Sequence, residues 1–368
     1  MSVGVSAAVA AKLPSHNTMK RTLRRVRQNG DLGLPNPTSQ RDMIIPEHVT
    51  LLASGEKFLQ FDSGQADDRI LLFGTQRNFR LLTQSQEWYA DGTFKSSPLL
   101  FDQLYTIHGV LGNSVMPAVF ALLPNKSQDT YERLLAAVKH LMPAAAPQSV
   151  LTDFEPAALN AFRNEYPNVV QRGCFFHFSQ CIYRNLQANG LQQRYENDAD
   201  FALQMRLLPA LAYVPLTDVV EAFNRLTESD ALPAEAQPVV DYFEDTWIGR
   251  PTRRNSRRPP RFQRELWNCY TSAVEGLPRT NNSCEGWHRS FSELVASHHP
   301  TFWKFLESLK LEQSKNEITV EQYLSGQQPS QPRRKYRDSA KRIMKIVGTY
   351  GNVDLLDYLR GVAHNFNF

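Results

Sequence analysis

The chain has 368 residues, of which 42% are hydrophobic and 21% are charged, and its formal net charge is +4. This length and composition suffice for one large domain or two modest ones, each with a sizeable core. Four cysteines are too few for a disulfide-rich secreted scaffold, and no apolar run reaches the roughly 18 residues of a membrane span. The composition therefore favours a protein of a reducing compartment and excludes an integral membrane protein built of helices.

Basic residues gather in three stretches of an otherwise nearly neutral chain: Lys20 to Arg27, Gly249 to Arg264 and Pro332 to Arg342. Clusters of this kind favour a polyanionic partner, with nucleic acid as the first candidate. Solvated surface loops are the alternative interpretation of each cluster.

In chain order, residues 1–55 are predicted to form a basic N-terminal arm and linker. Two short apolar runs at 58–64 and 68–75 are strand-like. The runs at 87–94, 101–111 and 115–124 are rich in aromatic and branched residues and are separated only by short turns, which predicts an antiparallel meander.

Two helices and two further strands follow the meander. Residues 127–143 have one apolar helical face, with Asp129 as a candidate cap, and residues 156–167 begin with Pro156 in the first turn. Strands are predicted at 148–155 and 168–178. The order β-β-β-α-β-α-β predicts an α/β fold in which helices pack on a mixed five-stranded sheet.

The strand pattern ends after this region, and the rest of the chain is predicted to be helical. We expect five segments: the arm, 1–55; the first part of a sheet-containing core, 56–178; a helical insertion with an arginine-rich loop, 179–275; the last helices of the core, 276–325; and a basic C-terminal tail, 326–368.

Two aspartates stand where predicted strands end. Asp91 interrupts an otherwise buried-looking run before Gly92, and Asp153 ends the fourth predicted strand. In the predicted sheet the first and fourth strands are neighbours, so both carboxylates lie at one edge. Adjacent carboxylates repel each other unless they are protonated or bridged by cations, and magnesium suits such a site.

A third acid would complete a two-metal site. Glu285 is the first candidate, because it opens a predicted helix after the insertion. Asn282 and Glu285 also have the spacing of a capping box, so a purely structural role for Glu285 stays open. Glu155 lies two residues after Asp153 and is the local alternative.

Four motifs occur in order: Asp91 before Gly-Thr-Phe, Asp153 in Thr-Asp-Phe-Glu, Cys174-x2-His177, and Glu285 after paired asparagines. In combination they resemble the Mutator-like element (MULE) transposase domain over about residues 85–312. The resemblance implies a ribonuclease-H-like fold in which Asp91, Asp153 and Glu285 are the metal-binding DDE triad. It also implies a structural motif near the active site made of Cys174, His177, Asn281, Asn282 and His288.

The implied activity is that of a DNA transposase, in which two Mg²⁺ or Mn²⁺ ions support phosphodiester cleavage and strand transfer. Its partners would be DNA, as element ends and target, and further copies of the chain; its compartment would be the nucleus. No cysteine precedes Cys174, so the zinc-binding recognition module of many relatives is not expected. That favours the alternative, a domesticated and catalytically silent DNA-binding or chromatin-associated protein. A ribonuclease-H-type nuclease that does not transpose is a third possibility.

Cys174 and His177 allow several roles. Together with Cys284 and His288 they could form a Cys2His2 zinc site, but the two halves of that site are 106 residues apart in the chain, which makes the signal weak, so zinc is not expected. The alternatives are a core cysteine beside a helix-start histidine, or His177 as a catalytic hydrogen-bond donor to the scissile phosphate.

The arginine-rich loop is predicted to bind the DNA backbone without sequence preference. A nuclear-import signal is the competing interpretation. Trp247, Trp267 and Trp287 flank the loop and could stack on a base, although core packing is the commoner role. The DNA-binding candidates are Arg250, Arg253, Arg254, Arg257, Arg258, Arg261 and Arg264.

Overall fold

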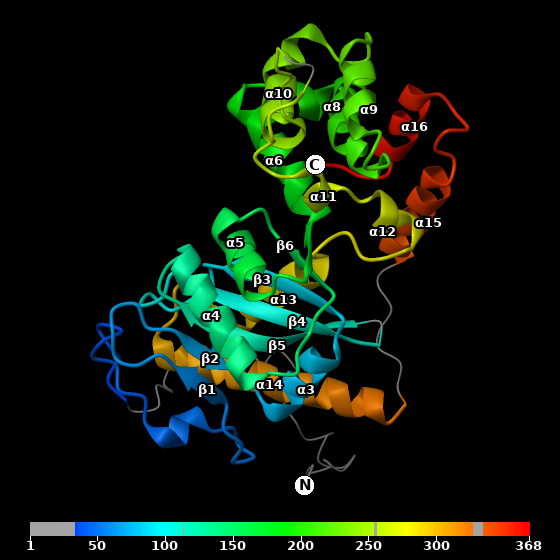
Figure 1. The fold of residues 1–368 in the computed structure, drawn as a ribbon. Helices are drawn as coiled ribbons and strands as arrows, with labels where there is room; N and C mark the ends of the chain where they lie inside the picture. Colours follow the sequence, from blue (N-terminus) through cyan, green and yellow to red (C-terminus); the bar gives the residue numbers. More distant parts are fainter. Residues whose placement is uncertain (1–33, 113, 254–255, 327–333) are drawn as a thin grey trace, which may run out of the picture.

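A computed structural model describes residues 34–112, 114–253, 256–326 and 334–368 (Figure 1). Its centre is a seven-stranded sheet in the order β1-β2-β5-β4-β3-β6-β7. The strands are β1 (Leu59–Asp62), β2 (Leu71–Phe73), β3 (Glu87–Thr93), β4 (Gln103–Leu111), β5 (Ser114–Leu123), β6 (Ser149–Thr152) and β7 (Val170–Gly173).

The sheet is mixed, as predicted, but it has seven strands instead of five. The strands β3, β4 and β5 form the antiparallel meander, and β6 and β7 follow in parallel beside β3. The two extra strands come from the apolar runs before the meander, because β2 pairs with the outer edge of β5 and β1 pairs with β2. The predicted contact between the first meander strand and the fourth predicted strand is confirmed as the β3–β6 pair.

The last predicted strand is shorter than expected. Strand β7 ends at Gly173, and helix α6 (Phe175–Ala188) begins two residues later. Aromatic residues favour a strand by propensity, but here they lie in a helix. Phe175 and Phe178 are three residues apart and are both buried on one face of α6. His177 therefore lies in the first turn of a helix.

Helices cover both faces of the sheet. One apolar core joins a sheet face to α3 (Gln76–Gln84), α4 (Gln128–Leu141) and α5 (Pro156–Glu165). A second core joins the other face to α13 (Asn282–Val295) and α14 (Phe302–Leu324). Pro156 is the first residue of α5, as predicted, whereas the cap of α4 is Ser127, not Asp129: its hydroxyl accepts from the Thr130 amide at 3.2 Å.

The remaining helices share a separate apolar core, and Figure 1 shows them as a helical body beside the sheet. The C-terminal helices belong to this core through Ile343, Val347 and Leu359. Its helices are α6, α7 (Gln192–Asn197), α8 (Ala199–Ala210), α9 (Val219–Thr227), α10 (Gln237–Phe243), α11 (Arg264–Trp267), α12 (Tyr270–Val274), α15 (Arg334–Val347) and α16 (Leu355–Ala363).

Short helical turns complete the fold: three 3₁₀ turns at Glu47–Thr50, Leu211–Tyr213 and Ala234–Ala236, and one π-helical turn, η4, at Glu244–Ile248. Among the described residues, no helix has both the length and the apolar character that a membrane crossing requires. The basic cluster at 20–27, Arg254 and the start of the third cluster lie outside the described residues.

Candidate active site

The carboxyl ends of three parallel strands bring chemically active residues to one edge of the sheet. In the β3–β6 register Tyr89 pairs with Leu151, so two residues further along each chain Asp91 and Asp153 follow side by side. Cys174 directly follows β7, and its amide donates to the Thr152 carbonyl at 2.8 Å. Ligand sites in open α/β sheets lie at such an edge.

Asp91 is 6% exposed. Its Oδ1 accepts a hydrogen bond from the Gly92 amide at 2.9 Å, and its Oδ2 lies 3.5 Å from His288 Nε2. Burial, and then the charge of Asp153, raise the pKa of Asp91 to about 8. Without a cation, this carboxyl group is therefore mostly protonated at neutral pH.

Burial also raises the pKa of Asp153. Its Oδ1 accepts a long hydrogen bond of 3.4 Å from the Glu155 amide. Glu155, the alternative third ligand, has its own partner: Lys126 Nζ lies 3.5 Å from Glu155 Oε2. Lys126 also lowers the pKa of both Asp91 and Asp153, against the larger effect of burial, so its charge reaches the site.

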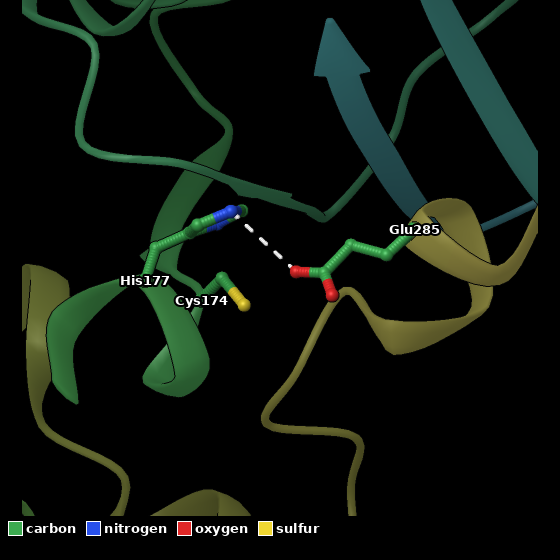
Figure 2. Close-up of side chains that lie close together, drawn as sticks. All are labelled: Cys174, His177 and Glu285. Atoms are coloured by element: carbon green, nitrogen blue, oxygen red, sulfur yellow. Dashed lines mark ion pairs between the residues drawn. The ribbon is translucent and has the colours of Figure 1, made fainter. Parts of the chain in front are cut away.

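Glu285 lies one turn into α13, a helix that contacts β3. The predicted capping box is wrong, because the helix begins at Asn282 and the preceding Asn281 makes no side-chain cap. Glu285 Oε1 lies 3.5 Å from His177 Nε2 (Figure 2). The charge of Glu285 also raises the pKa of Asp91, behind burial and Asp153, so Asp153 and Glu285 each lie within electrostatic reach of Asp91.

Cys174, His177 and Glu285 form a compact cluster in which one potential ligand atom from each lies within 4.8 Å of the others. Figure 2 shows the three side chains converging from the start of α6 and from α13. Burial raises the pKa of Cys174 to about 12 and of Glu285 above its usual value, and it lowers the pKa of His177.

The geometry does not favour a Cys2His2 site in which Cys284 and His288 join Cys174 and His177. His288 faces Asp91 and Thr106, and Cys284 is buried against Tyr89 and Leu151. The acid Glu285 takes the place beside Cys174 and His177.

A buried polar chain behind Asp91 was missed from sequence. His108 Nε2 lies 2.8 Å from Thr106 Oγ1, and Thr106 Oγ1 lies 3.3 Å from His288 Nε2. Thr106 is the direct partner of Asp91 across β3 and β4. The available signal was the presence of polar residues inside an apolar strand, the same signal that identified Asp91.

Asn281 ties the start of α13 to two strands. Its amide donates to Cys174 Sγ at 3.1 Å, and its side-chain nitrogen donates to the Ala90 carbonyl at 3.4 Å. These contacts fix the start of the helix that carries Glu285.

Backbone contacts join the described residues on either side of the tip of the arginine-rich loop. Pro251 and Arg257 form an isolated antiparallel bridge, and the Arg258 amide donates to the Arg250 carbonyl at 2.9 Å. Gly249 has φ of 91°, and a Cβ there would come within 2.0 Å of the Arg258 carbonyl oxygen. Only glycine fits this close approach.

The predicted DNA-binding arginines fall into two groups. Arg257 binds Glu244 at 2.7 Å and Asn224 at 2.6 Å, Arg250 binds Asp245 at 2.9 Å, and Arg264 donates to the Ile248 carbonyl at 3.3 Å. These three therefore stabilise the loop itself. The other described arginines of the loop, Arg253, Arg258 and Arg261, are exposed to solvent, as is Arg250.

Aromatic packing connects this loop to the acidic edge. Phe154, directly after Asp153, makes edge-to-face contacts with Trp247 at 5.0 Å and Phe262 at 5.2 Å. Trp247 and Trp267 are fully buried, and Trp287 stacks on Phe291. Core packing is thus the confirmed role of the first two tryptophans.

Cationic side chains surround the cluster. Arg184 adds to the lowering of the His177 pKa by burial, and Arg289 lowers the pKa of Glu285 against burial. Both arginines are exposed. With Lys126 they place positive charge around the edge. Arg184 and Arg289 had not been identified from sequence, because neither belongs to a basic run.

Residues 87–181 match the family model of the MULE transposase domain. The chain carries a MULE transposase domain. The matched segment runs from the start of β3 into α6, so it includes Asp91, Asp153, Cys174 and His177 and ends before Glu285. Comparison with curated proteins gives no match.

Proposed function

We propose that this MULE domain is the catalytic part of a DNA transposase, and that Asp91, Asp153 and Glu285 hold two divalent cations for strand cleavage and transfer. The observation that carries the proposal is the pair of aspartates brought together by adjacent parallel strands, buried Asp91 on β3 and half-buried Asp153 directly after β6. In the described part of the chain, no lysine or arginine forms an ion pair with either aspartate. Two adjacent acids that no lysine or arginine pairs with directly fit hard cations such as Mg²⁺ or Mn²⁺.

The order of the strands in the sheet supports the same proposal. The strands β5, β4, β3, β6 and β7 lie in the order third, second, first, fourth and fifth of the predicted five. This is the arrangement expected of a ribonuclease-H-like core, to which we assign the domain. The strands β1 and β2 are then additional strands beside β5.

When bound, the cations would supply activation of the attacking hydroxyl and stabilisation of the departing 3′-oxygen. The side chains have separate tasks. Asp91 and Asp153 provide the buried negative charge, and His288 fixes the orientation of Asp91 from 3.5 Å away. His177, held beside Glu285 at the rim, donates a hydrogen bond to the scissile phosphate.

The exposed cations provide the DNA contacts of the proposal. Arg253, Arg258 and Arg261 line the outer side of the loop, and Arg184 and Arg289 flank the cluster. Such side chains bind phosphates without reading bases. We place the protein in the nucleus, on element ends and target DNA, where two ends must be held by an assembly of several copies.

The test is cleavage of a labelled duplex carrying candidate element ends, with Mg²⁺ or Mn²⁺. The wild-type chain should nick or join the duplex, whereas Asp91→Ala and Asp153→Asn should lose this activity by at least about 100-fold. Asp200→Asn, an exposed aspartate on α8, is the matched control and should retain activity. Salt-sensitive DNA binding without cleavage under either metal would refute the catalytic proposal and support the silent DNA-binding derivative instead.

A further inference from the structure

The donor set of the Cys174–His177–Glu285 cluster differs from that of the aspartate pair. It offers sulfur, imidazole nitrogen and carboxylate oxygen, with one ligand atom of each within 4.8 Å of the others. Magnesium takes oxygen ligands, whereas zinc commonly binds thiolate, imidazole and carboxylate together. The chemistry of these three residues therefore selects a softer ion than the one proposed for Asp91 and Asp153.

Two buried polar atoms of the cluster lack partners. Neither His177 Nδ1 nor Glu285 Oε1 has a hydrogen-bond partner among the residues that the structure describes. A buried polar atom without a hydrogen bond destabilises the folded state, so two in one cluster indicate that something else satisfies them. His177 Nε2, 3.5 Å away, is too distant to form a good hydrogen bond with Glu285 Oε1, and a cation beside the thiol would give this oxygen a close partner.

The cluster is held in place by contacts that do not involve a metal. The Asn281 amide donates to Cys174 Sγ at 3.1 Å, which is the outer-shell hydrogen bond expected for a ligating sulfur. The Phe175 amide donates to the Arg279 carbonyl at 2.9 Å, which joins the start of α6 to the chain before α13. The side chains of His177 and Glu285 are 22% and 29% exposed, so an ion can enter from solvent.

From these observations we infer that Cys174, His177 and Glu285 form a zinc site with one open position, and that zinc there removes Glu285 from the magnesium site. The second half of this inference rests on the proposed function, because it requires Glu285 to serve both sites. Since Glu285 faces His177 at 3.5 Å, a zinc ion would hold it on that side. Zinc would then inhibit magnesium-dependent cleavage without displacing the ions from Asp91 and Asp153.

The binding half is tested with Co²⁺ as a spectroscopic substitute for zinc on the full-length chain. The wild type should give a thiolate-to-cobalt absorption band that Zn²⁺ abolishes by competition. Cys174→Ser should lose the band, and its affinity should fall by more than about 100-fold, the upper range for loss of an outer-shell partner. Cys181→Ser, on the same helix, and Cys269→Ser, in the helical body, are controls that should keep it.

A second variant separates loss of the ion from loss of the fold. His177→Gln should bind Co²⁺ weakly yet unfold at nearly the wild-type temperature in a chelator, and added Zn²⁺ should raise that temperature only in the wild type. A wild-type chain without a thiolate band, or a band that survives in folded Cys174→Ser, would overturn the zinc site.

A separate measurement tests whether Glu285 serves both the zinc site and the magnesium site. Asp153→Asn should retain the cobalt band although it lacks cleavage, so failure of the proposed function leaves the zinc site testable. In the active wild type, low Zn²⁺ should remove most Mg²⁺-dependent cleavage, and Cys174→Ser should need at least about tenfold more Zn²⁺ for the same fractional loss. Equal sensitivity of both proteins would refute the shared ligand.

Discussion

At the scale of single residues, the environment of Asp91 disfavours the charged form of its carboxyl group. Asp91 is 6% exposed, and burial and its neighbour Asp153 raise its pKa to about 8. Glu285 raises it further and Lys126 lowers it, while His288 faces it from α13. A cation bound at this edge, as proposed, would stabilise the charged carboxylate, so the metal-free protein and the metal-bound protein should respond differently to pH.

The stability of the metal-free protein should fall as pH rises. A carboxyl group whose pKa is raised on folding contributes stability below its unfolded pKa, near 4, and loses it as pH rises through the folded value of about 8. Asp91→Asn removes this dependence. In thermal unfolding with a chelator, the unfolding temperature of the variant minus that of the wild type should increase by roughly a few degrees between pH 5 and pH 8. An equal difference at both pH values would contradict the assignment.

His288 should act as a positioning residue for Asp91. It is 7% exposed, and its Nε2 lies between Asp91 Oδ2 and Thr106 Oγ1. Loss of an outer-shell partner typically lowers metal affinity by about 10–100-fold. His288→Leu should therefore raise the Mg²⁺ concentration for half-maximal cleavage by about that factor, whereas His140→Leu, an exposed histidine on α4, should not. An unchanged magnesium requirement would exclude the positioning role.

At the scale of elements, α13 and the arginine-rich loop build the site around the sheet edge. The buried residues of α13, at 284, 288, 291 and 295, form one helical stripe that packs against the sheet. Glu285 lies beside that stripe, which directs it toward His177 at the rim. The loop is held separately, through Phe154 and the ion pair between Arg257 and Glu244.

Gly249 should be essential for the conformation of this loop. Its φ is 91°, and a Cβ would come within 2.0 Å of the Arg258 carbonyl oxygen. Gly190 has φ of 75° with no atom within 4 Å of a Cβ, so it isolates the cost of the backbone angle. Gly190→Ala should destabilise the protein by about 1 kcal/mol, and Gly249→Ala by at least about 2 kcal/mol more. Equal effects in denaturant unfolding would show that the loop adjusts freely.

At the scale of the whole molecule, we expect DNA binding to depend on the positive charge of a few residues. Replacing Arg253, Arg258 and Arg261 by serine should lower the slope of log affinity against log salt by about 0.9 for each phosphate that the loop no longer neutralises. Arg257→Ser should mainly lower stability, because this side chain binds Glu244 and Asn224. A salt slope unchanged in the triple variant would exclude the loop as a DNA-binding element.

The sequence predicted the parts of this architecture that depend on local chemistry. Asp91 and Asp153 were identifiable because an acid in an apolar run is unusual, and the turns between strands set the meander. Which arginines of the loop stabilise it was not predictable from sequence, since Arg257 binds Asn224, 33 residues away in the chain. The cluster of Cys174 with Glu285 likewise depends on tertiary contact between α6 and α13, which neither segment encodes alone.

The most direct measurement of the central claim is iron-mediated cleavage of the protein backbone. Fe²⁺ bound in place of magnesium should cut the chain near residues 91, 153 and 285, and excess Mg²⁺ should suppress the cuts near the two aspartates. Cuts that avoid both aspartates, or that persist in excess magnesium, would contradict a metal site at this edge of the sheet.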